Sequence, residues 1–398
     1  MNPIFLILVA LFSNFFGWFI VNKYCMSLQM ACANHLFNEY YFSESIFELG
    51  IIYIFLFLIG IFFYRKQKKG NKSIFTSEIV FDKKYGYWVL TIFILANIFY
   101  NLFSLNFGFD VSMRGAGQFD RDIGSAISRI SLLVFPIFVL YRLSFNDKKS
   151  VFLTNIFLVT VLFSSLVSAD RRILFYYLIA ILLIKFYEGG SRIKFKNYVY
   201  IFLIILLLPL LYLRRFDGDF FELSKVVGFV FLQSSIGALG VSAILPQVKY
   251  LIVNNTGYLF GKSFIYYILM LFVPSFLIYF LGGNEFYFRS SLYFDDLFND
   301  NPNMGYDFMM IADFYWNFGY FGYFIYAFLV FLIFYLSSNV RVRSSIKYQG
   351  VFIIIIVFFI AGQRSDFGLF MKSSLYSIVL YYFLYKILPK RKFIEGVK

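Results

Sequence analysis

The chain has 398 residues, of which 61% are hydrophobic and only 15% are charged, and its formal net charge is +14 at pH 7. Soluble domains contain about 25% charged residues, so this composition excludes an ordinary soluble protein. The lysines stand in short clusters between apolar segments, a pattern typical of contact with anionic lipid headgroups, and we therefore expect no nucleic-acid partner.

Apolar segments recur along the chain, and each is long enough to cross ~30 Å of hydrocarbon as an α-helix. Strand-type alternation is absent, which argues against an outer-membrane barrel. The strong segments lie near 3–21, 46–64, 87–106, 127–145, 151–167, 173–187, 198–213, 318–337, 349–361 and 373–388, and two weaker ones lie at 226–248 and 264–282. The sequence predicts an all-α polytopic membrane protein with 10–12 transmembrane helices that form a single domain over 1–398.

Charge predicts the topology. The connector 65–86 is rich in Lys and Arg, which concentrate in cytoplasmic loops, so it is expected inside, and alternation then makes both termini cytoplasmic. The alternation of lysine-rich inner connectors with outer connectors holds if both weak segments cross the membrane, which gives twelve spans, or if neither does, which gives ten. With ten spans, residues 214–317 form one large extracytoplasmic region that contains the weak helices. With twelve, the alternative we favour, the connector 249–263 is cytoplasmic.

Basic residues differ between the two predicted sides. Lysine dominates the inner side, whereas arginine dominates the outer side. A guanidinium group stays charged and binds phosphate oxygens through two donors at once, so this bias predicts a site for a lipid diphosphate. Pairing with the acids of the outer loops is the structural alternative. The outer arginines are Arg114, Arg121, Arg129, Arg171, Arg172, Arg214, Arg215, Arg289 and Arg364.

Some of these arginines have informative surroundings. Arg171 and Arg172 end a short connector between two predicted spans, so their side chains must stay at the membrane surface. Arg114 and Arg121 lie in a glycine-rich loop whose N–H groups could also bind an anion. Arg129 lies inside the start of a predicted span, and such a charge indicates either a functional site or an anchor that reaches the interface.

The segment 303–337 is the most informative of the chain. Its polar first part contains Asp313 and continues through Tyr315-Trp316-Asn317-Phe318-Gly319 into a long apolar helix, and the stretch GKSFIYYILMLFVPSF precedes it. This order resembles the C-terminal part of the O-antigen polymerase (Wzy-type oligosaccharide repeat-unit polymerase) family. The step from Ser168 to Arg171 is similar to that family's Ser-x-x-Arg.

The resemblance implies a multi-pass glycosyltransferase of GT-C-like architecture in the bacterial cytoplasmic (inner) membrane. Its reaction would polymerise polyprenyl-diphosphate-linked oligosaccharide repeat units into O-antigen, capsule or exopolysaccharide on the outer face. The expected partners are the lipid-linked oligosaccharide, membrane lipid and a chain-length regulator protein. The alternatives are a flippase or transporter of lipid-linked oligosaccharides, and an O-antigen ligase.

Such a reaction needs a base for the attacking sugar hydroxyl and fixed cations for the diphosphate that leaves. We expect Asp313 as the base, with Asp170 and Asp366 as rivals, and Arg171 and Arg172 as catalytic cations. Structural pairing with arginine is the alternative role for each acid. The expected substrate-binding residues are Arg114, Arg121, Arg129, Arg214, Arg215, Arg289, Tyr315, Asn317 and Arg364.

We expect neither a cofactor nor a metal ion. Asp217-Gly218-Asp219 and Asp295-Asp296 have carboxylate spacings that would suit Mg²⁺, but such pairs are common in polar loops, and the many outer arginines make a metal less necessary. His35 is the single histidine of the chain, so a histidine base is a less favoured alternative.

Overall fold

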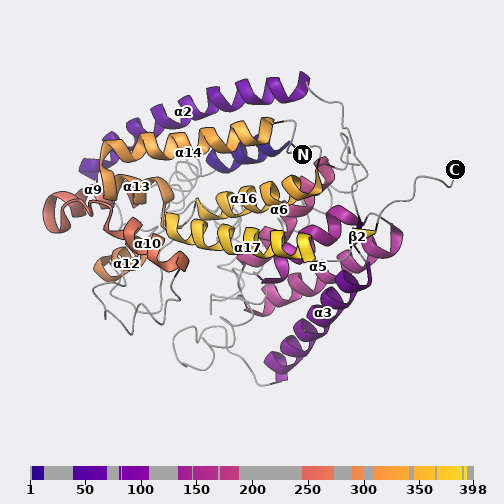
Figure 1. Cartoon of the computed structure of the whole chain (residues 1–398). Helices are drawn as coiled ribbons and strands as arrows, with labels where there is room; N and C mark the ends of the chain where they lie inside the picture. Colours follow the sequence, from indigo (N-terminus) through magenta and orange to yellow (C-terminus); the bar gives the residue numbers. More distant parts are fainter. Residues whose placement is uncertain are drawn as a thin grey trace, which may run out of the picture.

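The computed structural model describes residues 2–12, 39–69, 80–81, 83–106, 133–145, 147–168, 171–187, 244–272, 289–298, 308–339, 345–363, 365–387 and 390–391. In these ranges the chain forms a bundle of helices (Figure 1). Two short strands of two residues each, β1 (Val80–Phe81) and β2 (Lys390–Arg391), pair antiparallel beside it. The prediction of a helical protein is confirmed for this part of the chain.

The helices have the following bounds. In chain order they are α2 (Glu39–Lys69), α3 (Lys83–Asn106), α5 (Lys148–Ser168), α6 (Arg171–Tyr187), α9 (Ile244–Leu251), the π-helix η3 (Ile252–Thr256), α10 (Lys262–Phe272), α12 (Ser290–Phe298), α13 (Met310–Phe318), α14 (Tyr320–Ser338), α16 (Ile346–Gly362) and α17 (Phe367–Ile387). Two further helices cover Pro3–Phe12 and Leu133–Ser144.

Within the described part of the chain, three helices are long and apolar enough to cross a membrane: Ser43–Lys66 within α2, α14 and α17. Large apolar side chains on these helices point away from the bundle, and Ile54, Phe324 and Phe383 are all more than half exposed. Exposed apolar side chains of this kind fit helices that face lipid. These features are those of an integral membrane protein, whereas the total number of spans, the side of each terminus and a GT-C-like arrangement stay predictions.

One end of the bundle is basic. The pair β1–β2 joins the connector before α3 to the C-terminal segment, and Lys83 lies 2.6 Å from the Asp147 carboxylate. Lys347 and Lys386 both lie over the ring of Tyr382, at 4.8 and 5.0 Å. The structure thus gathers at one end several segments that the charge pattern predicts to be cytoplasmic. We call this the basic end.

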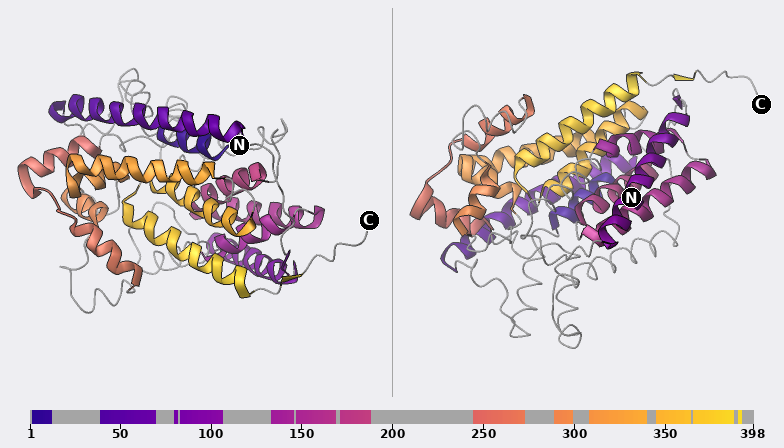
Figure 2. Two further views of the ribbon diagram at one scale, coloured as in Figure 1. Left: turned by 45° about the horizontal axis from the view of Figure 1, so that its top comes forward. Right: turned by 90° about the horizontal axis from the view of Figure 1, so that it is seen from below.

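The opposite end is built from short helices. There α9, α10, α12 and α13 surround the first turns of α14 and α17, while α2, α14, α16 and α17 run side by side toward the basic end (Figures 1 and 2). Lys249 of α9 lies against Glu44 and Glu48 near the start of α2. The connector 249–263 therefore lies at the end opposite to the basic one. If the basic end faces the cytoplasm, as the charge pattern predicts, this connector lies on the outer side, as in the ten-span alternative; the choice between ten and twelve spans stays a prediction.

A tight corner joins α13 to α14 and sets the position of the site. Gly319 has a φ of 59°, in the left-handed region that favours glycine, and its N–H donates to the Tyr315 carbonyl at 2.7 Å. Gly322 faces the Phe314 backbone so closely that an added Cβ would lie 2.1 Å from the carbonyl oxygen. The glycines of this segment therefore allow α14 to start directly against α13.

Aromatic rings fill the middle of the bundle. Tyr177 of α6 contacts Phe138 and Phe157 with ring centroids 4.9 Å apart in both pairs, and Phe135 meets Phe358 of α16 at 5.5 Å. Each such pair adds about 0.5–1.5 kcal/mol beyond the burial of its area. Because these rings are fully buried, they hold α5, α6 and α16 in one core.

Candidate functional site

Asp313 lies at the centre of a buried polar cluster at the end of the bundle opposite to the basic end. It is fully buried on α13, and its carboxylate accepts hydrogen bonds from four groups. Oδ1 accepts from Asn317 Nδ2 at 3.0 Å and from Ser263 Oγ at 3.5 Å. Oδ2 accepts from the Phe367 N–H at 2.9 Å and from the Tyr267 hydroxyl at 3.3 Å. The carboxylate is therefore surrounded by donors from α10, α13 and α17.

Asn317 fixes the orientation of Asp313. Residues four apart share one face of a helix, and the Asn317 amide donates to both the carboxylate and the backbone carbonyl of Asp313. Its Oδ1 lies 2.9 Å from Ser263 Oγ, so the single Ser263 hydroxyl proton is shared between Asn317 and the more distant Asp313 carboxylate. The spacing between the acid and the asparagine in segment 303–337 thus has a physical reason: one turn of α13 brings the two side chains together.

A second carboxylate, Asp366, lies just before α17 and binds Arg289. Both Nε and Nη2 of Arg289 donate to Asp366 Oδ2, at 3.0 and 2.7 Å, and Ser291 donates to the same oxygen. Asp366 Oδ1 accepts from the Leu369 N–H at 2.9 Å, which caps α17. Asp366 is fully buried, whereas the Arg289 side chain is 23% exposed. Arg289 is therefore the charged group of the site closest to the surface.

The first turn of α17 connects the two acids. The backbone N–H groups of this first turn have no acceptor within the helix, and they form the positive end of the helix dipole, which attracts carboxylates. Phe367 gives its N–H to Asp313 and Leu369 gives its N–H to Asp366. The Tyr267 hydroxyl also lies 2.9 Å from Ser290 Oγ. One helix start thus holds both carboxylates.

The electrostatics of Asp313 favour its neutral form. Burial raises the pKa of Asp313 to about 7, and the nearby negative charge of Asp366 adds to this rise. The Phe367 N–H, the nearby Ser290 hydroxyl and the Tyr267 hydroxyl lower the pKa and only partly offset the burial. A carboxyl group with such a pKa exchanges its proton near neutral pH, a property common among catalytic acids and bases.

The structure brings together four of the residues that the sequence singled out, namely Asp313, Asn317, Arg289 and the rival base Asp366. The Asp366–Arg289 pair is the arginine pairing that we kept as the alternative role of these acids. Sequence reasoning missed four hydroxyl groups of the cluster. They are those of Ser263, Tyr267, Ser290 and Ser291. Ser263 and Tyr267 stand four residues apart in the stretch GKSFIYYILMLFVPSF. This spacing places both hydroxyls on one face of a helix and could have identified them as a pair.

Tyr315 lies outside this cluster, on another face of α13. Its ring stacks on Tyr323 with centroids 5.0 Å apart, and Lys249 Nζ lies 5.5 Å from the ring centre. Lys249 in turn lies 2.8 Å from Glu48 and 3.1 Å from Glu44. This second group, which we call the ion-pair cluster, ties α9 to α2 and α14. Tyr315 is almost completely buried in it.

The remaining site predictions fall mostly outside the described residues. Arg171 and Arg172 begin α6, whose start lies at the far end of α5 from the Lys83–Asp147 pair, but their side chains are not described. The predictions outside the described ranges are Arg114, Arg121, Arg129, Arg214, Arg215, Arg364, Asp170, His35, Asp217 and Asp219. Among the described residues, no three His, Cys, Asp or Glu side chains are grouped as they would be around a metal ion.

The fold and the site together define a helical membrane protein with a buried carboxylate–arginine cluster at one end of its bundle. The chain matches no protein-family model, no curated protein and no solved structure.

Proposed function

We propose that this protein is a membrane glycosyltransferase that polymerises polyprenyl-diphosphate-linked oligosaccharide repeat units into O-antigen, capsule or exopolysaccharide on the outer face of the bacterial cytoplasmic membrane. The observation that supports it most is the cluster in which Asp313 and Asn317, from the segment that resembles the polymerase family, lie with Arg289. The cluster lies away from the basic end, as an outward-facing site requires if the basic end faces the cytoplasm.

Arg289 is the residue we assign to the substrate diphosphate. Its side chain is partly exposed, and Asp366 and Ser291 hold the guanidinium in one orientation. A cation held in place before the reaction stabilises charge as it develops on a leaving group, without a cost of reorientation. As the anomeric carbon separates from the diphosphate oxygen, the negative charge grows on that oxygen and the guanidinium stabilises it.

Asp313 is the group we assign as the final proton acceptor. A sugar hydroxyl of the incoming unit attacks the anomeric carbon of the growing glycan, the bond to the diphosphate breaks, and the hydroxyl proton must leave. Asp313 is too deeply buried to touch a sugar, and Ser290 and Tyr267, whose hydroxyls bond to each other, are buried as deeply. The proton therefore passes through these two hydroxyls only once the bound substrate opens the cluster on the side of the partly exposed Arg289. A pKa of about 7 suits a group that accepts and returns a proton.

A pair of substitutions tests the role of Arg289. Arg289→Ala alone would leave Asp366 buried without its cation, at a cost of about 3–5 kcal/mol, so lost polymer could reflect lost protein. The double variant Arg289→Gln with Asp366→Asn keeps hydrogen-bonding groups at both positions and removes both charges. We expect normal protein in the membrane and surface glycans of single repeat units only.

The readouts are a gel of the surface polysaccharide and the amount of folded protein in the membrane. Normal polymer in the double variant would refute the diphosphate role of Arg289. In cells that lack the protein, the location of the lipid-linked units separates the alternatives. Units that stay on the inner leaflet would favour the flippase or transporter, and long polymer that is not joined to its final lipid would favour the ligase.

A further inference from the structure

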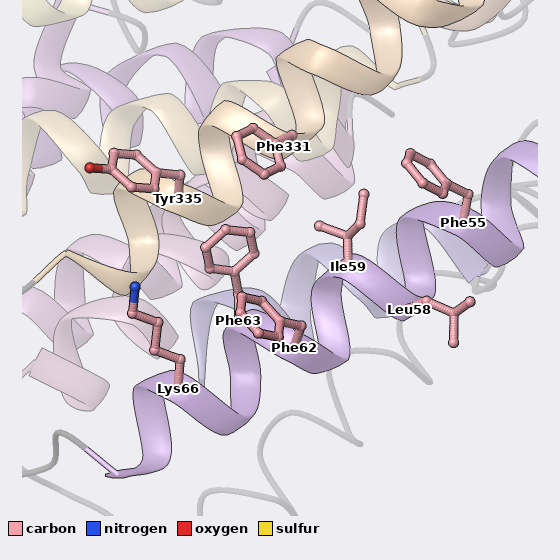
Figure 3. A pocket seen from close by; sticks show the side chains of 8 residues that line it. All are labelled: Phe55, Leu58, Ile59, Phe62, Phe63, Lys66, Phe331 and Tyr335. Atoms are coloured by element: carbon pink, nitrogen blue, oxygen red, sulfur yellow. The ribbon is translucent and has the colours of Figure 1, made fainter.

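A groove lies between α2 and α14 near the basic end of the bundle (Figure 3), far along both helices from the Asp313 cluster. Its volume is about 470 Å³, within the range of roughly 300–1,000 Å³ found for pockets that hold small ligands. The lining residues are Phe55, Leu58, Ile59, Phe62, Phe63, Lys66, Phe331 and Tyr335. Six of these side chains are apolar, so the groove suits a hydrocarbon chain.

The groove has a polar end and an apolar end. In Figure 3, Lys66 extends toward the side of the groove where Tyr335 lies, and Phe55 lies at the opposite end. Lys66 lies eleven positions after Phe55, which corresponds to about 16 Å along α2. Phe63 is buried and forms the base, while Phe62 and Tyr335 are exposed at the sides. The groove therefore opens outward from the bundle.

The polar end coincides with the end of a candidate span. The apolar part of α2 that is long enough to cross a membrane ends at Lys66. Long basic side chains at such positions extend to the headgroup region, while the residues before them lie among the acyl chains. A molecule in the groove would therefore place a polar group at Lys66 and run into the membrane toward Phe55.

We propose that this groove binds one acyl chain of an anionic phospholipid and that Lys66 and the Tyr335 hydroxyl hold its phosphate. The charge of the site selects the lipid class, because Lys66 offers a compact positive charge next to Arg65 and no acid lines the groove. The apolar side chains select a molecule with a long chain. This inference is independent of the proposed glycosyltransferase activity.

Native mass spectrometry of the purified full-length protein in detergent tests the site. We expect bound phosphatidylglycerol with 16- to 18-carbon chains, less bound phosphatidylcholine of the same chain length, and little bound dihexanoyl phosphatidylglycerol. Lys66→Gln should weaken phosphatidylglycerol binding about fivefold, the effect of one lysine at an anionic surface. Lys148→Gln is the matched control, because Lys148 is an exposed lysine at the basic end outside the groove.

Three results would overturn the inference: equal loss of binding in the Lys66 and Lys148 variants, equal binding of the two headgroups, or equal binding of the short- and long-chain lipids. Should Lys66→Gln not yield folded protein, Leu58→Trp provides the second test. Leu58 is exposed, so a larger ring there fills the groove without entering the core and should reduce binding of the long-chain lipid. Unchanged binding in that variant would also count against the site.

Discussion

Asp313→Asn separates the proton-accepting role of Asp313 from its structural role. The substitution removes the ionisable group and keeps its shape. Two of the four donors around the carboxylate are N–H groups, those of Phe367 and Asn317, and they face different oxygens. Whichever way the new amide turns, its NH₂ group meets one of them. A buried donor without an acceptor costs about 1–3 kcal/mol.

The lost charge acts in the opposite direction. The pKa of Asp313 rises from its ordinary value of 3.8 to about 7 on folding, which corresponds to roughly 4 kcal/mol when the group ionises. The folded state binds the proton more tightly than the unfolded state, so this group favours folding below about pH 4, and that contribution is lost as the pH rises to 7. At neutral pH the asparagine variant should therefore be about as stable as the wild type, or more stable.

The assay is thermal unfolding of both purified proteins in detergent between pH 4 and 8, together with a gel of surface polysaccharide. We expect the unfolding temperature of the wild type to fall as the pH rises, a flatter profile for Asp313→Asn, and no polymer from the variant. Parallel pH profiles would refute the assignment of a raised pKa to Asp313. Normal polymer from a folded variant would remove Asp313 as the proton acceptor.

Further predictions concern stability and are checked by thermal unfolding in detergent. Gly322→Ala should destabilise the corner between α13 and α14 by several kcal/mol, because the new methyl group meets the Phe314 backbone; an unchanged unfolding temperature would contradict that contact. Lys249→Met should cost about 3–5 kcal/mol, because it leaves the largely buried Glu48 carboxylate without its cation and with the neutral Tyr323 hydroxyl as donor. Lys83→Met breaks an exposed pair and should cost at most ~1 kcal/mol. Equal losses in these two variants would contradict the difference in burial.

Local patterns in the sequence were sufficient for the helices and for part of the site. Apolar segments of about 20 residues can satisfy their backbone groups in lipid only as helices or barrels, so composition and spacing predict helices. The four-residue step from Asp313 to Asn317 is one turn of a helix, and the step from Ser263 to Tyr267 repeats it. Both pairs form one-sided polar faces that the sequence displays directly.

Only the tertiary structure decided which charges meet. Arg289 and Asp366 are 77 residues apart, and the Phe367 N–H reaches Asp313 across 54 residues. The charge pattern alone is compatible with several outer acids as the partner of Arg289, because electrostatic attraction depends on distance in space and not on position in the sequence. The packing of α10, α12, α13 and α17 selected one partner and excluded the rest. The groove at Lys66 likewise exists only because α14 lies against α2, a contact between segments that no local pattern pairs.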